Sequence, residues 1–102
     1  MDAQIRKVTR KVLRANGTEI PLPGPVSTAE IAAMLGAELL DSVVLADRLH
    51  VMLVDDAGHI KGLPVNRFAT MLYRQRARPG ATHVIRGDVV IVPDSDYEPA
   101  GG

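Results

Sequence analysis

The chain has 102 residues and a mass of 11.0 kDa, the size of one compact domain. It contains no cysteine, which excludes disulfide bonds, thiolate metal sites and cysteine nucleophiles. Twelve basic and twelve acidic side chains give a net charge of zero, so bulk charge does not point to nucleic acid or membrane. No apolar run approaches the roughly 20 residues of a membrane span, and no signal-peptide pattern opens the chain. We therefore expect a cytoplasmic protein without a cofactor.

The charges are unevenly distributed along the chain. Residues 1–20 hold five basic side chains against two acids, and residues 57–87 hold six basic side chains and no acid. Residues 21–56 and 88–102 are acidic. One interpretation is that segments of opposite charge lie beside one another in the fold. The other is that a basic face remains for an anionic partner.

The first predicted element is a β-hairpin around Asn16-Gly17, a pair typical of a type I′ turn. A two-residue turn places Leu13 opposite Ile20 and Arg14 opposite Glu19, which pairs apolar and oppositely charged side chains. The two strands are expected at 7–15 and 18–22.

Residues 28–35 are predicted to form a helix. Ser27 and Glu30 have the spacing of a capping box, in which each side chain binds the backbone N–H of the other residue. Ile31 and Leu35 lie on one apolar face, and a glycine follows directly, as is typical of a helix C-terminus. A helix this short depends on the packing of that face.

The second predicted helix begins at Pro64, because a proline in the first turn lacks only an N–H that the helix does not need. Val65, Phe68, Ala69 and Leu72 fall at i, i+3, i+4 and i+7, so they are expected to form its buried face. Apolar runs predict the remaining strands, at 43–46, 49–54, 59–61, 83–85 and 89–92.

These elements predict a single α+β domain over residues 1–93. We expect a mostly antiparallel sheet of about five to six strands with both helices on one face. Residues 94–102 are rich in acids, proline and glycine, and are expected to form a flexible acidic tail.

Two runs in the second half of the chain resemble a known family. They are residues 62–73, which begin Gly62-Leu63-Pro64-Val65-Asn66-Arg67 and are preceded by residues 55–61, and residues 85–92, which begin Ile85-Arg86-Gly87-Asp88. With the residues around them they resemble a small bacterial and phage family catalogued as domain of unknown function number 3846, over about residues 18–93. The resemblance implies a phage or mobile-element setting and brings no activity with it.

Asn66, Arg67, Tyr73 and Arg74 are the candidate partner-binding residues, expected on the exposed side of the second helix. The planar guanidinium of Arg67 suits a carboxylate or phosphate, and a helix N-terminus also favours anions. The alternative is that Asn66 binds backbone groups of the first turn and Arg67 pairs with an acidic loop.

Other chemistry has little support in the sequence. The three histidines have no recognised metal-ligand spacing, and no nucleophile elbow or phosphate-binding loop is present. Asp47, Asp55 and Asp56 lie at predicted turns, where aspartate commonly binds its own backbone. We therefore expect neither an enzyme nor a metal site.

The sequence thus predicts a small non-catalytic binding or regulatory module with an unknown protein partner, and no membrane partner. The alternative is a nucleic-acid-binding accessory protein that uses the basic segments 6–14 and 67–78. That alternative requires both segments to share one surface. Aromatic residues make up only 3% of the chain, so few side chains could stack on bases.

Overall fold

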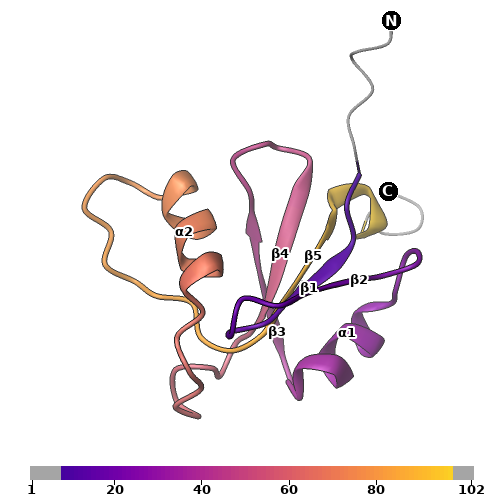
Figure 1. Ribbon diagram of the computed structural model, residues 1–102, viewed down its shortest axis with the longest axis horizontal. Helices are drawn as coiled ribbons and strands as arrows, with labels where there is room; N and C mark the ends of the chain where they lie inside the picture. The colour runs from indigo at the N-terminus through magenta and orange to yellow at the C-terminus, as the bar shows by residue number, and fades with distance from the viewer. Residues whose placement is uncertain (1–7, 98–102) are drawn as a thin grey trace, which may run out of the picture.

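The computed structural model describes residues 8–97 (Figure 1). It has one five-stranded antiparallel sheet, in the order β2-β1-β5-β4-β3, and two helices, which confirms the predicted α+β class. Neither helix in this part of the chain is long and apolar enough to cross a membrane. The elements are β1 (Lys11–Leu13), β2 (Glu19–Pro21), α1 (Thr28–Leu35), β3 (Leu40–Val44), β4 (His50–Asp55), α2 (Arg67–Arg76), β5 (Val89–Pro93) and a 3₁₀ helix (Asp94–Tyr97).

The two helices lie on opposite faces of the sheet, so the expectation that they share one face is wrong (Figure 1). Side chains alternate along β4: Val51 packs in one apolar cluster with Ile31 of α1, and Met52 packs in the other with Ala69 of α2. A strand covered on both faces needs apolar residues at consecutive positions, and this is why β4 reads as a continuous apolar run.

The hairpin between β1 and β2 has a longer loop than expected. Leu13 pairs with Glu19, which shifts the register by one residue from the predicted pairing. Gly17 has a φ angle of 92°, whereas Asn16 does not reach the positive φ that a type I′ turn requires. Arg14 consequently forms its ion pair with Asp88, the residue just before β5, at 3.4 Å, and not with Glu19.

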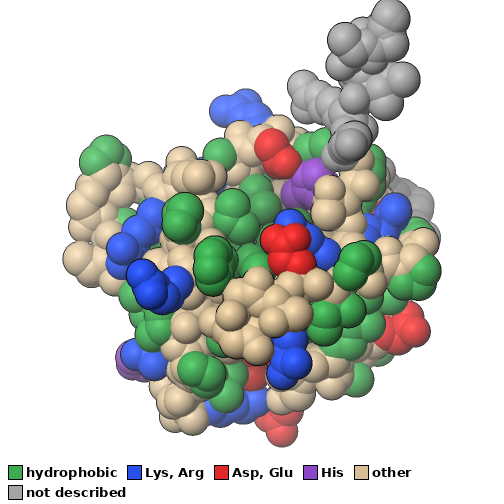
Figure 2. All heavy atoms as spheres, in the orientation of Figure 1, with side chains coloured by type: hydrophobic (Ala, Val, Ile, Leu, Met, Phe, Trp, Pro, Cys, Tyr) green, Lys and Arg blue, Asp and Glu red, His purple; other side chains and the backbone are tan. Residues whose placement is uncertain are grey.

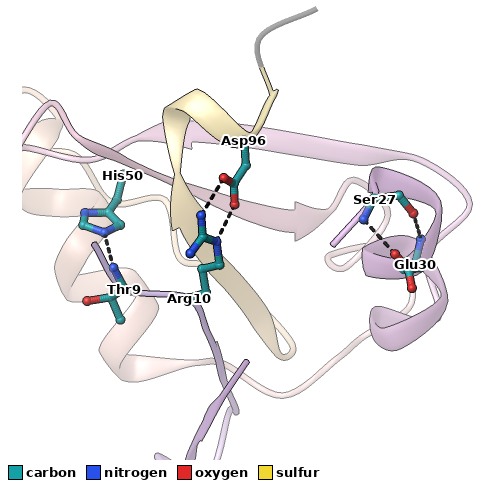
Figure 3. A network of polar contacts seen from close by, with 6 residues as sticks. All are labelled: Thr9, Arg10, Ser27, Glu30, His50 and Asp96. Carbon is teal, nitrogen blue, oxygen red and sulfur yellow. Dashed lines mark hydrogen bonds and ion pairs between the residues drawn. The ribbon is translucent and has the colours of Figure 1, made fainter. Parts of the chain in front are cut away.

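Helix α1 has the bounds and both ends that the sequence predicts. Ser27 Oγ accepts from the Glu30 N–H at 3.1 Å, and the Glu30 carboxylate accepts from the Ser27 N–H at 2.9 Å (Figure 3). Gly36 ends the helix with a φ angle of 66°, a left-handed conformation that glycine adopts without a steric cost. Ile31 is the helix residue that is completely buried against the sheet.

Two predicted strands are absent from the described sheet. Residues 57–63 form hydrogen-bonded turns, in which the Lys61 N–H donates to Ala57 O at 2.9 Å. Residues 83–85 lie outside the strands, because the backbone of Ile85 binds α2: its N–H donates to Thr70 Oγ1 and its carbonyl accepts from the Asn66 N–H. The five observed strands are those that remain.

The 3₁₀ helix 94–97 belongs to the folded domain, so the predicted boundary at residue 93 is wrong for these four residues. Asp96 accepts two hydrogen bonds from the Arg10 guanidinium, at 2.8 and 2.9 Å, and its side chain is only 7% exposed (Figure 3). A paired, buried carboxylate holds the segment against the start of β1. The rest of the predicted tail, 98–102, and residues 1–7 lie outside the described residues.

We predict that acid destabilises the protein partly through Asp96. The hydrogen bonds from Arg10 hold the pKa of the Asp96 carboxyl below its ordinary value, although burial acts in the opposite direction. A lowered folded-state pKa gives stability that is present at neutral pH and is lost as the pH falls through that pKa, below about pH 4. Asp96→Asn should therefore be less stable than wild type near pH 7, and urea titrations should show this gap closing at low pH. A gap that is independent of pH would contradict the prediction.

Candidate functional site

Asn66, one of the predicted binding residues, is completely buried at the start of α2 and is the N-cap of that helix. Its Oδ1 accepts from the Ala69 N–H at 3.0 Å, which is the usual N-cap bond. Its Nδ2 donates to Leu13 O and to Gly87 O, both at 3.0 Å. One side chain thus joins α2 to β1 and to the turn before β5. The expectation that Asn66 is exposed to a partner is wrong, and its structural alternative holds.

Thr70 completes the attachment of α2. Its Oγ1 donates to Asn66 O at 2.8 Å and accepts from the Ile85 N–H at 2.9 Å. The Asn66 N–H also donates to Ile85 O at 2.8 Å. These bonds are buried and satisfy both partners, so they fix the helix to the segment that leads into β5 with little freedom. A helix held in this way presents its outer side chains in a fixed arrangement.

The outer surface of α2 combines arginines with large apolar side chains. Arg67 and Arg74 are exposed, and Phe68 and Met71 between them are 49% and 57% exposed. Spacings of three and four residues place these four side chains side by side on the helix. We call Arg67, Phe68, Met71 and Arg74 the α2 outer face. Figure 2 shows blue side chains beside green ones over α2.

Tyr73 does not belong to the α2 outer face, although the sequence places it there. It is partly buried against the cluster beneath α2, and its ring meets His83 edge to face at a centroid distance of 5.4 Å. An aromatic pair of this geometry adds packing energy and anchors the loop that follows the helix. Of the four predicted residues, the structure brings Arg67 and Arg74 together on one exposed surface, buries Asn66 completely and leaves Tyr73 partly buried.

The sequence pattern did not reveal Phe68 and Met71 as exposed. Phe68 fits the expected stripe of Val65, Ala69 and Leu72, but the helix begins at its Asn66 cap and turns Ala69 and Thr70 inward. The edge of the Phe68 ring instead lies over Gly17, where an added Cβ would be 2.8 Å from Cε2. Asn66, two residues after Pro64, is the sequence signal for the buried face of α2. As an N-cap it sets where the helix begins, and so which side chains turn toward the sheet.

The arginines of α2 are not neutralised by the described part of the chain. No acidic side chain within residues 8–97 forms an ion pair with Arg67, Arg74 or Arg76 of α2, or with Arg78 just after the helix. Arg74 makes one long hydrogen bond, from Nη2 to Thr82 O at 3.4 Å. The ion pairs within residues 8–97 join other cations to acids, and the helix therefore keeps a local positive charge.

The basic start of the chain is different, because its described cations all have acidic partners. Arg10 pairs with Asp96, Lys11 with Glu19 at 3.0 Å, and Arg14 with Asp88. Arg6 and Lys7 lie outside the described residues. Pairing with an acid reduces the attraction of each cation for a phosphate backbone.

A shallow pocket of about 410 Å³ extends the basic surface past the C-terminal end of α2. Gln75 and Arg76 line it from the helix, and Arg48 lines it from the turn between β3 and β4. The last turn of α2 also carries Arg74, and cations there are favoured by the helix dipole.

His50 is the residue that most resembles a catalytic group, because its Nδ1 lies 2.7 Å from an Asp47 carboxylate oxygen. Its other ring nitrogen, Nε2, accepts from the Thr9 N–H at 2.9 Å (Figure 3), so Nδ1 must be the donor to Asp47. Both nitrogens are thus occupied, and the side chain is buried. Burial raises the pKa of Asp47, but the hydrogen bonds from the Leu49 N–H and from His50 together bring that pKa below its ordinary value. The arrangement closes the β3–β4 turn and leaves His50 no free nitrogen for a substrate.

Within residues 8–97, no three histidine or acidic side chains cluster as metal ligands. No family model, curated protein or solved structure in the three comparisons matches this chain. Its function must therefore be inferred from its own surfaces.

Proposed function

We propose that this protein is a small non-catalytic binding or regulatory module, and that its α2 outer face docks an acidic segment of another protein. The observation that carries the proposal is the pairing of exposed apolar side chains, Phe68 and Met71, with arginines that have no acidic partner among the described residues. The family resemblance of residues 62–73 and 85–92 supports a phage or mobile-element setting. A cytoplasmic location is part of the proposal, and the cysteine-free sequence is compatible with it.

The composition of the α2 outer face suits a protein partner. Aromatic residues, methionine and arginine are enriched in protein interfaces, where large side chains exclude water and arginine binds carboxylates with two parallel hydrogen bonds. The buried bonds of Asn66 and Thr70 hold the helix in place before any partner arrives. Pre-organisation of this kind lowers the entropy lost on binding.

The alternative function is nucleic-acid binding through segments 6–14 and 67–78. The arginines of α2 favour it, and the ion pairs of Arg10, Lys11 and Arg14 oppose it. If it is correct, duplex DNA or RNA should be retarded in a gel at about 50 mM salt and released steeply as salt rises. Retardation that Arg67→Ala with Arg74→Ala abolishes would assign the α2 outer face to nucleic acid and overturn the protein-binding proposal.

We predict that random displayed peptides selected on this protein include a class rich in aspartate, glutamate and apolar residues. Arg67→Ala combined with Arg74→Ala should weaken these peptides about tenfold or more in fluorescence anisotropy, and Phe68→Ala should do the same, because interface hot spots are commonly arginine and large apolar side chains.

Arg14→Ala is the matched control, since Arg14 is an exposed arginine outside the α2 outer face. It should leave the affinity unchanged, and thermal melting should show that all variants fold. An acidic class that binds the double variant as tightly as wild type would refute the assignment of the surface.

A further inference from the structure

The sheet has two edge strands, β2 and β3, and they differ in how readily an added strand could pair with them. Strand β2 has three residues, ends in Pro21, and is followed by Pro23 and Pro25. Proline supplies no N–H to a partner strand, so this edge is blocked. Strand β3 has five residues without proline, and its one charged side chain is Asp41. It is the more open of the two edges.

The backbone of β3 is available at every second residue. The Leu45 N–H donates to His50 O and the Asp56 N–H donates to Leu39 O, which fixes the odd-numbered residues of β3 as those bonded to β4. The N–H and carbonyl groups of Leu40, Ser42 and Val44 therefore point away from the sheet. Of these, the Ser42 N–H is bonded to the Asp41 carboxylate at 2.9 Å, an exposed bond that a partner strand could replace.

A groove runs beside the same three residues. It has a volume of about 590 Å³ and lies between α1 and β3. Leu39 and Val44, at 69% and 41% exposed, leave apolar surface open there. A strand added to β3 would place alternate side chains into this groove while its backbone bonds the edge, which is the β-addition mode of peptide recognition. The apolar part of the lining is Ala29, Ala32, Leu39, Leu40, Val44, Val51 and Leu53.

The charged side chains that line the groove indicate which kind of segment it would bind. Its charged lining residues are acidic, Glu38 and Asp94, and no ion pair within residues 8–97 involves either of them. Glu38 lies at the Leu40 end of β3. Asp94 follows Pro93, which pairs with His50, and so lies at the opposite end, near Val44. Antiparallel pairing of two copies of β3 would bring Glu38 of one copy toward Asp94 of the other, which is repulsive.

We propose that the β3 edge and the groove beside α1 bind an extended segment of another protein, with alternating apolar residues and lysine or arginine at its ends, as a sixth strand. This surface lies on the α1 side of the sheet and is independent of the α2 outer face.

Selection of random displayed peptides on the wild-type protein should therefore yield a second class, basic and apolar. Ser42→Pro removes an outward N–H that makes no bond to β4, and it should weaken this class about tenfold or more. Glu38→Lys with Asp94→Lys should have a similar effect, whereas Asp56→Lys, an exposed acid outside the groove, should not. Peptides N-methylated at the alternate residues whose N–H groups face β3 should fail to bind, whereas methylation of the other alternate set should be tolerated. The acidic class should bind Ser42→Pro unchanged, which separates this proposal from the α2 outer face.

Failure to select a basic and apolar class would overturn the proposal. Equal binding of that class to wild type and to a Ser42→Pro variant that melts as a folded protein would also overturn it. Sedimentation of the wild type as a dimer that Ser42→Pro dissociates would assign the edge to a second copy instead.

Discussion

Asn66→Ala should lower the free energy of unfolding by about 3–5 kcal/mol, because it removes three buried hydrogen bonds to backbone groups, and a buried backbone group left unpaired costs about 1–3 kcal/mol. The groups are Leu13 O, Gly87 O and the Ala69 N–H. A domain of this size is stable by about 5–15 kcal/mol, so the loss is a large part of the total. Urea unfolding followed by circular dichroism measures it.

Two further variants separate the roles of the Asn66 side chain. Asn66→Ser keeps an oxygen for the Ala69 N–H and loses the two bonds from Nδ2, so its loss should be intermediate. Asn16→Ala is the control, because Asn16 makes one exposed bond, with the Thr18 N–H, and should cost less than about 1 kcal/mol. If Asn66→Ala costs no more than Asn16→Ala, Asn66 does not attach α2 to the sheet.

Ile31→Ala should lower the free energy of unfolding by about 2–4 kcal/mol, the usual cost of a cavity at a buried isoleucine. Ile31 has no exposed surface and is the core contact of an eight-residue helix, which is too short to be stable by its own hydrogen bonds. Denaturant unfolding again measures the change.

Met34→Ala is the matched control within α1, since Met34 is 44% exposed. Its effect should stay below about 1 kcal/mol. The same denaturant curves test the placement of α1: an Ile31→Ala loss no larger than that of Met34→Ala would mean that the helix does not pack on the Val51 face of the sheet.

Local signals in the sequence predict α1 because its ends are set by neighbouring residues. Ser27, Glu30 and Gly36 each act within a few positions, and the observed helix has the predicted bounds. The face on which α1 packs is a tertiary property. The continuous apolar run of β4 fits a strand covered on both faces, but it does not say which helix covers which face.

The candidate site was half predictable from the sequence. Arg67 and Arg74 were identified because they are seven residues apart on a helix and no acid lies nearby in the chain. The sequence does not show that Asn66 is buried, because asparagine is typical both of a helix N-cap and of an exposed binding residue. The sequence predicts Phe68 as buried and Tyr73 as exposed, whereas Phe68 is exposed and Tyr73 is partly buried. An apolar stripe shifted by one residue fits the spacing almost equally well.

Although the net charge of the chain is zero, the structure separates cations that are paired with acids from cations that are not. Two of the described cations before β2 pair with distant acids, Arg10 with Asp96 and Arg14 with Asp88. These pairs connect residues more than seventy positions apart, so no local pattern could predict them. Within residues 8–97 the arginines of α2 form no such pair, so the helix keeps a local positive charge.

A charge exchange on the α2 outer face tests the central claim most directly. The dissociation constants of a selected acidic peptide and of its copy with lysine for each acid would be measured on wild type and on Arg67→Glu with Arg74→Glu. We expect wild type to prefer the acidic peptide and the variant to prefer the lysine copy, each by about tenfold or more. Unchanged preference in the variant would show that these arginines do not form the docking surface.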